Sequence, residues 1–143
     1  MTSRNIPPPP PAIVIHSLAD AEAALVAASA LGVSVTLISA PGAAGYAGPA
    51  WFRAVVEKAQ GGHPDVAATA ILDCGDMPGH ALAALRAGVR TVRFAGPTAD
   101  KIADIARQYG ATVFAERPEA LDLDGVAGDR VAACRKWLEG HRI

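Results

Sequence analysis

The chain has 143 residues, of which 51% are hydrophobic and 19% charged, and its 13 basic and 14 acidic residues give a formal net charge of -1. This length suits one domain whose core needs no disulfide or metal to hold it together. The balanced charge excludes the basic surface on which nucleic-acid binding depends. Cys74 and Cys134 lie far apart, in no metal-type spacing, so we expect no disulfide and a reducing, cytoplasmic location.

Residues 1–11 are predicted to form a flexible proline-rich tail, because Pro7–Pro11 favour an extended polyproline II conformation. Such an arm suits the SH3-like groove of a partner or, as we prefer, a stiff lead-in to the first strand. Residues 12–143 are expected to form a single α/β domain.

A long uncharged stretch runs from Ala23 to Phe52, and it matches the length of a membrane-spanning helix. Gly32 and Pro41 interrupt it, and the segment between them alternates as a strand does. We therefore expect no membrane partner. The early prolines also exclude the apolar region of a signal peptide.

Strands and helices alternate along the rest of the chain. Apolar runs predict strands at 12–16, 33–40, 67–73, 91–95 and 111–115. Helical spacing predicts helices at about 17–31, 49–60, 78–87 and 98–109, with a last helix after the polar turn at 121–129. This order predicts five βα units around a mainly parallel sheet. A flavodoxin-like three-layer sandwich is our first expectation, and a partial (half) TIM-type barrel is the alternative.

Polar residues before the helices predict N-caps. Ser17 and Asp20 have the spacing of a capping pair, Asp76 precedes Pro78, and Thr98 precedes the fourth helix. Three helices carry apolar stripes that predict their buried faces: Trp51, Phe52, Val55, Val56 and Ala59; Ile102, Ile105, Ala106 and Tyr109; Val131, Cys134, Trp137 and Leu138. The last stripe, or the open sheet of a half-barrel, could also support a homo-oligomer.

Ligands of parallel α/β sheets bind beyond the carboxyl ends of the strands. The residues at these positions form the candidate site: His16, Ser17, Gly42, Gly45, Gly48, Asp73, Cys74, Asp76, Gly96, Thr98, Glu116 and Arg117.

The loop at 41–49 has glycines at three-residue intervals before a helix, namely Gly42, Gly45 and Gly48. Backbone N–H groups in such a loop can bind an anion. The loop lacks the lysine and hydroxyl residue of a P-loop and the dinucleotide-binding glycine pattern, so a lid or packing turn is the preferred interpretation.

Asp73 is the candidate catalytic residue, because an acid that ends a buried strand needs either a partner or a task. Asp76 and His80 follow closely enough to suggest a metal. A capping role for Asp76 and an exposed position for His80 explain them better, so neither metal nor cofactor is expected. Cys74 is no evident nucleophile, because a neighbouring carboxylate disfavours its thiolate.

Arg93 lies within the fourth strand, on the side opposite Val92 and Phe94. A charged side chain there needs a carboxylate partner, a ligand anion or a path to solvent. A salt bridge with Asp73 is slightly preferred over recognition of a carboxylate or phosphate ligand.

The stretch "HALAALRAGVRTVRFAGP" resembles part of the KDPG-aldolase-like (βα) barrel enzymes, over about residues 67–118. In that family a helix ending in Ala-Gly leads into a strand that carries a Schiff-base lysine. Arg93 stands at the position of that lysine and cannot form an imine. The resemblance therefore implies an anion-binding barrel segment without the aldolase mechanism.

Two functions follow from these residues. The first is a small binding or interaction domain without its own catalysis that recognises a small anionic metabolite. The alternative is a small lyase or isomerase that acts on a phosphorylated or carboxylated metabolite, with Asp73 as acid/base and Arg93 or the 41–49 loop binding the anion. We favour the first, because the strand ends supply no complete set of acid, base and nucleophile.

Overall fold

A computed structural model describes residues 7–141, so residues 1–6 of the predicted tail and residues 142–143 lie outside the described residues. The strands are β1 (Ala12–Val14), β2 (Val35–Ile38), β3 (Ala68–Asp73), β4 (Thr91–Arg93), β5 (Thr112–Phe114) and β6 (Ala120–Asp122). The helices are α1 (Leu18–Leu31), α2 (Ala43–Tyr46), α3 (Pro49–Gly61), α4 (Pro78–Arg86), α5 (Ala99–Gln108), the 3-10 turn η1 (Leu123–Gly125) and α6 (Arg130–His141).

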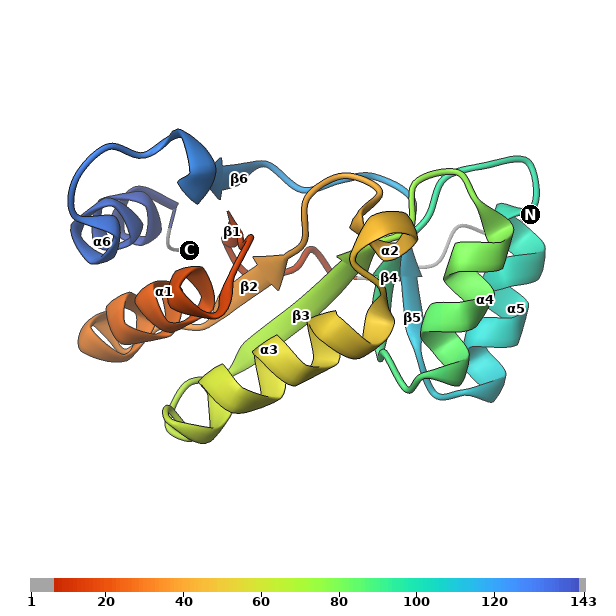
Figure 1. Ribbon diagram of the computed structural model, residues 1–143, viewed down its shortest axis with the longest axis horizontal. Coiled ribbons are helices and arrows are strands. Elements are labelled where there is room, and N and C mark those ends of the chain that lie inside the picture. Colours follow the sequence, from red (N-terminus) through yellow and green to blue (C-terminus); the bar gives the residue numbers. More distant parts are fainter. Residues whose placement is uncertain (1–6, 142–143) are drawn as a thin grey trace.

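The strands form one parallel sheet in the order β5-β4-β3-β2-β1-β6, which confirms the predicted α/β class (Figure 1). From β1 to β5 each strand pairs with the next one in the sequence, and β6 joins the free edge of β1. Successive units of a (βα) barrel have this sequential order, so it is a feature of the half-barrel alternative. A flavodoxin-like sheet has its first strand between the second and third.

The two faces of the sheet have separate apolar clusters. The main core lies between the sheet and the helices, and it buries Phe52 on α3, Leu85 on α4, Ile102 on α5 and Leu138 on α6. The second cluster consists of strand residues alone: Ala12, Val14, Ile38 and Ile71, with Phe114 and Ala120 packed against them. Among the described residues, the helices therefore contribute to one face of the sheet.

A short connection, residues 115–119, joins β5 to β6 although these strands are at opposite edges of the sheet (Figure 1). On its way it places Arg117 against Asp73 and the carbonyl of Ser39, at the carboxyl ends of β3 and β2. The connection therefore crosses the sheet at the carboxyl ends of its central strands.

The described part of the proline tail runs beside β2. Thr36 donates one hydrogen bond from its hydroxyl to the carbonyl of Pro10 and another from its backbone N–H to the carbonyl of Pro11. This arrangement agrees with a lead-in to β1.

None of the helices within residues 7–141 combines the length and apolar character that crossing a membrane requires.

Two short elements of the structure were not predicted from the sequence. The predicted loop at 41–49 contains α2, and the predicted polar turn at 121–129 begins with the end of β6 and continues into η1. A helix of four residues and a strand of three are too short to show a hydrophobic period. The structure therefore has a sixth strand in addition to the strands of the five predicted βα units. Its position is determined by its pairing with β1, which local sequence patterns do not show.

The predicted helix ends were partly correct. Ser17 caps α1, because its Oγ accepts a hydrogen bond from the backbone N–H of Asp20. The prediction for Asp76 was wrong: Pro78 is the first helical residue of α4, so Met77 occupies the N-cap position and Asp76 is exposed. Thr98 precedes α5 as predicted, but its hydroxyl makes no capping hydrogen bond.

The three predicted apolar stripes face the core, with one exception. The exception is Tyr109, which is 46% exposed and directly follows Gln108, the last helical residue of α5. On α6, Cys134 and Leu138 are fully buried, and this helix packs along α1. The stripe of the last helix is therefore used within the chain.

Candidate functional site

The carboxylate of Asp73 lies at the centre of the carboxyl edge and is fully buried. Its Oδ1 accepts hydrogen bonds from the backbone N–H groups of Gly42, at 3.0 Å, and Gly75, at 2.8 Å. Its Oδ2 accepts one from Nη1 of Arg117 at 2.8 Å, and Nη1 of Arg93 lies 3.7 Å away. Groups from four different segments therefore converge on one carboxylate.

Ser39 extends this cluster and was not among the residues predicted from the sequence. Its buried Oγ accepts a hydrogen bond from the backbone N–H of Asp73 at 2.9 Å and donates one to the carbonyl of Ala40. Its own carbonyl accepts a hydrogen bond from Nη2 of Arg117 at 2.9 Å. The sequence contained one signal for Ser39. It is a hydroxyl residue directly after the apolar run of β2, and Asp73 likewise stands at the end of β3.

Arg93 has the surroundings that the strand pattern predicted. Val92 and Phe94 are fully buried on the helix-covered face, and Arg93 points to the other face. The register pairs it with Asp73, which confirms the predicted salt bridge. Its Nε donates a hydrogen bond to the carbonyl of Ala115 at 3.0 Å, so the side chain also fixes the start of the crossing connection.

A second polar pair lies beside this cluster, where β1 and β6 end. Nε2 of His16 is 2.7 Å from Oδ1 of Asp122, which also accepts a hydrogen bond from the backbone N–H of Asp124. Partial burial alone would raise the pKa of Asp122, but the hydrogen bonds from His16 and Asp124 and the charges of His16 and Arg117 together lower it. His16 was predicted at this edge, whereas Asp122 was not.

The glycine loop has the geometry of a packing turn. Gly42 has a φ of 68°, and its N–H donates to Asp73 instead of facing an empty anion site. Gly45 lies against the ring of His80, where a Cβ atom would be 2.6 Å from Cε1. His80 is therefore packed on α2, contrary to the exposed position predicted for it. Gly48 has a φ of 88° and precedes α3.

The other predicted site residues do not join the cluster. Within residues 7–141, Ser17, Asp76 and Thr98 make no hydrogen bond or ion pair with Asp73, Arg93 or Arg117. Glu116 is exposed. A Cβ atom on Gly96 would lie 3.2 Å from the ring of Phe94, which indicates a packing role.

In the described part of the chain, no three His, Cys, Asp or Glu side chains come together in a group that could hold a metal ion. Both cysteines are buried and free. Burial raises the pKa of each thiol to about 12, with a smaller contribution from Asp73 for Cys74 and from Asp20 for Cys134.

Of the residues predicted for the site, the structure brings Asp73, Arg93, Arg117 and Gly42 together in one charged cluster.

Comparison with known proteins supplies no further constraint on this cluster, because the chain matches no protein-family model and no curated protein sequence.

Replacing the central carboxylate should destabilise the fold. We expect Asp73→Ala to lower the free energy of unfolding by about 3–5 kcal/mol, because it leaves the partly buried guanidinium groups of Arg93 and Arg117 and the N–H groups of Gly42 and Gly75 without their acceptor. Urea unfolding followed by circular dichroism measures the change. Asp76→Ala removes an exposed acid three residues away and should change stability by about 0.5 kcal/mol or less. Equal stabilities for the two variants would contradict a structural role for Asp73.

The two thiols should be inert in the folded protein. With pKa values of about 12 for Cys74 and Cys134, the thiolate that reacts with a disulfide reagent is scarce at pH 8. We expect no release of thionitrobenzoate from native protein and release of two equivalents in guanidinium chloride, since the chain has two cysteines. Rapid labelling of one thiol without denaturant would show that its surroundings open.

The lowered pKa of Asp122 predicts a change in stability with pH. Because the folded state favours the carboxylate, its contribution is present above the unfolded pKa of about 3.9 and is lost as the pH falls through the folded value. Unfolding free energies of the wild type and Asp122→Asn should differ at about pH 5 to 6 and converge as the pH falls below about 4. Curves that stay parallel throughout would argue against this assignment.

Proposed function

We propose that this protein is a small binding domain without catalysis of its own, and that it recognises a small anionic metabolite at the carboxyl edge of its sheet. Arg93 is the residue that contacts the anion, beside the structural pair of Asp73 and Arg117. This proposal rests on one observation, the two guanidinium groups of Arg93 and Arg117 that converge on the single carboxylate of Asp73.

Two guanidinium groups converge on a single carboxylate in this cluster. Arg117 donates from both terminal nitrogens, to Asp73 and to the Ser39 carbonyl, and is therefore committed to the fold. Arg93 donates from Nε to Ala115, while its Nη1 is 3.7 Å from Asp73, beyond hydrogen-bond distance. The side chain of Arg93 is 23% exposed, and a guanidinium with donors that make no hydrogen bond within residues 7–141 is suited to bind a carboxylate or phosphate.

The same contacts favour binding over the lyase or isomerase alternative. A general acid or base must come within hydrogen-bond reach of a substrate proton. The oxygens of Asp73 are fully buried and accept hydrogen bonds from Gly42, Gly75 and Arg117. An acid held in this way stabilises the edge of the sheet. The thiols of Cys74 and Cys134 do not replace it as a reactive group, because their raised pKa values disfavour the nucleophilic thiolate.

A cytoplasmic location and self-association belong to the same proposal. Cys74 and Cys134 are free thiols, as is usual in a reducing compartment. The outer edges of β5 and β6 have no strand partner within residues 7–141, and such edges can pair between copies of a chain.

Thermal unfolding in the presence of anions tests the proposal. We expect inorganic phosphate or ribose 5-phosphate, at about 100 times its Kd, to add about 2.7 kcal/mol to stability and to raise the Tm by several degrees. Sodium chloride at equal ionic strength controls for general salt effects.

Two variants make this test specific to the site. Arg93→Ala should abolish the Tm shift. Arg107→Ala, which removes an exposed arginine paired with Asp104 on α5, should retain it. A panel of phosphates and carboxylates without any specific shift, or an undiminished shift in Arg93→Ala, would refute the proposed anion site.

A further inference from the structure

The amino-terminal part of β3 has no counterpart in its neighbour β4, because β4 begins further along the sheet. It pairs with β2 from Ala68 to Ile71, but its pairing with β4 is restricted to Leu72 and Asp73. The amino-terminal half of β3, residues 68–70, is therefore a short open edge in the interior of the strand order. This edge is at the opposite end of the strands from the Asp73 cluster.

The hydrogen-bond pattern gives the direction of the backbone groups along this edge. The carbonyls of Ala67 and Ile71 accept hydrogen bonds from Val35 and Ser39, so the odd-numbered residues of β3 face β2. Backbone groups alternate in direction along a strand, and those of Ala68 and Ala70 therefore face the other way. No strand of the described chain pairs with these two residues on that side.

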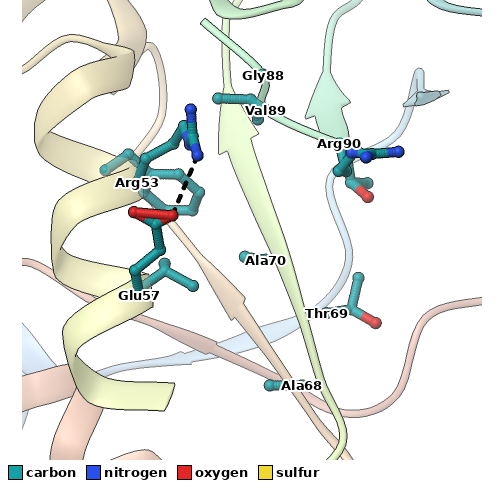
Figure 2. A pocket seen from close by; sticks show the side chains of 11 residues that line it. Arg53, Glu57, Ala68, Thr69, Ala70, Gly88, Val89 and Arg90 are labelled. Atoms are coloured by element: carbon teal, nitrogen blue, oxygen red, sulfur yellow. Dashed lines mark hydrogen bonds and ion pairs between the residues drawn. The ribbon is translucent and has the colours of Figure 1, made fainter. Parts of the chain in front are cut away.

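The burial of β3 changes at the same place. Ile71, Leu72 and Asp73 are fully buried, whereas the three preceding residues are partly exposed. A cavity of about 450 Å³ lies along these residues, between α3 and the beginning of β4. Figure 2 shows Ala68, Thr69 and Ala70 beside this space, with Arg53 and Glu57 on the helix at its other side.

The walls of this cavity, which we call the β3 groove, are held in place by the fold. Arg53 of α3 donates a hydrogen bond to the carbonyl of Ala87 at 2.6 Å and another to Glu57 at 3.1 Å. Arg53 thereby links the α3 wall to the end of α4. The side chain of Arg90 points away from the groove in Figure 2, and its guanidinium lies near Gly110. The groove consequently has no unengaged charged group aimed into it that would select a small anion.

We propose that the β3 groove binds an extended peptide segment of another protein, which adds as a short strand beside Ala68–Ala70. The backbone of such a segment supplies the donors and acceptors that the open edge lacks. This site is separate from the proposed anion site and does not depend on it.

The lining of the groove indicates the side chains of the peptide. Phe52, Val56 and Val89 form an apolar wall towards the helices, and the hydroxyl residues Thr69 and Thr91 lie along the strands. Because side chains of a strand alternate between two faces, the peptide should alternate apolar β-branched residues with hydroxyl residues. A Thr-Val repeat has this pattern.

Peptide binding tests the proposal directly. The probe is a fluorescein-labelled KTVTVTK amide, titrated with the full chain and followed by fluorescence anisotropy. Two control peptides carry N-methyl groups at alternate backbone nitrogens, one at odd and one at even positions. We expect saturable binding of the probe, a loss of about ten-fold or more for the control whose blocked nitrogens face β3, and a smaller loss for the other.

Protein variants locate the binding. Ala70→Leu places a larger side chain in the groove and should abolish binding of the probe. Ala54→Leu is the control for the same change of side chain, because Ala54 is exposed on α3, the helix that forms the other wall, and does not line the groove. Circular dichroism and Tm measurements show whether each variant folds.

Hydrogen exchange provides a readout that needs no variant. The backbone N–H of Ala70 should exchange much faster than that of Ile71 in the free protein, and the bound probe should slow it. Equal binding of all three peptides, unchanged binding to folded Ala70→Leu, or an Ala70 N–H already protected without peptide would each overturn the proposal.

Discussion

The buried carboxylate of Asp73 is the interaction on which the carboxyl edge of this fold depends. A charge without contact to solvent costs several kcal/mol unless opposite charge and hydrogen bonds compensate for it. Here the compensation comes from the glycine loop through Gly42, from β4 through Arg93 and from the β5–β6 connection through Arg117. The connection has to cross the sheet, since its two strands are at opposite edges, and Arg117 holds it against the central strands.

In the same arrangement, different residues serve the stability of this edge and the binding that we propose for it. Every contact that makes the burial of Asp73 tolerable also occupies one of its oxygens, so the residue gains a structural role and loses access to a substrate. Arg93 is the more weakly engaged of the two arginines, at 3.7 Å from Asp73 against 2.8 Å for Arg117. A guanidinium held at Nε by Ala115 is already oriented for the anion that we propose it binds, and a preoriented donor loses less side-chain entropy on binding.

The sequence was sufficient for features that depend on long patterns or on adjacent strand ends. The alternation of apolar runs predicts the parallel sheet, and the rule that parallel strands end together brings Asp73 and Arg93 to one edge. The sequence was insufficient where a single residue or a distant strand determines the local structure. Pro78 moves the N-cap from Asp76 to Met77, and the pairing of β6, which carries Asp122, depends on a distant strand instead of local periodicity. The resemblance to KDPG-aldolase-like barrels stays a prediction.

The open half of β3 follows from how α4 ends. Gly88 has a φ of 88° and turns the chain, and the N–H of Val89 then bonds back to the carbonyl of Ala84. The chain enters β4 only after this turn, with the carbonyl of Arg90 already paired to β5, so β4 has no residues left to cover the beginning of β3. Charged side chains beside a short edge oppose indiscriminate strand pairing, and Arg53 and Glu57 have this position. An edge that is short, flanked by charge and lined by apolar side chains is better suited to a specific peptide than to aggregation.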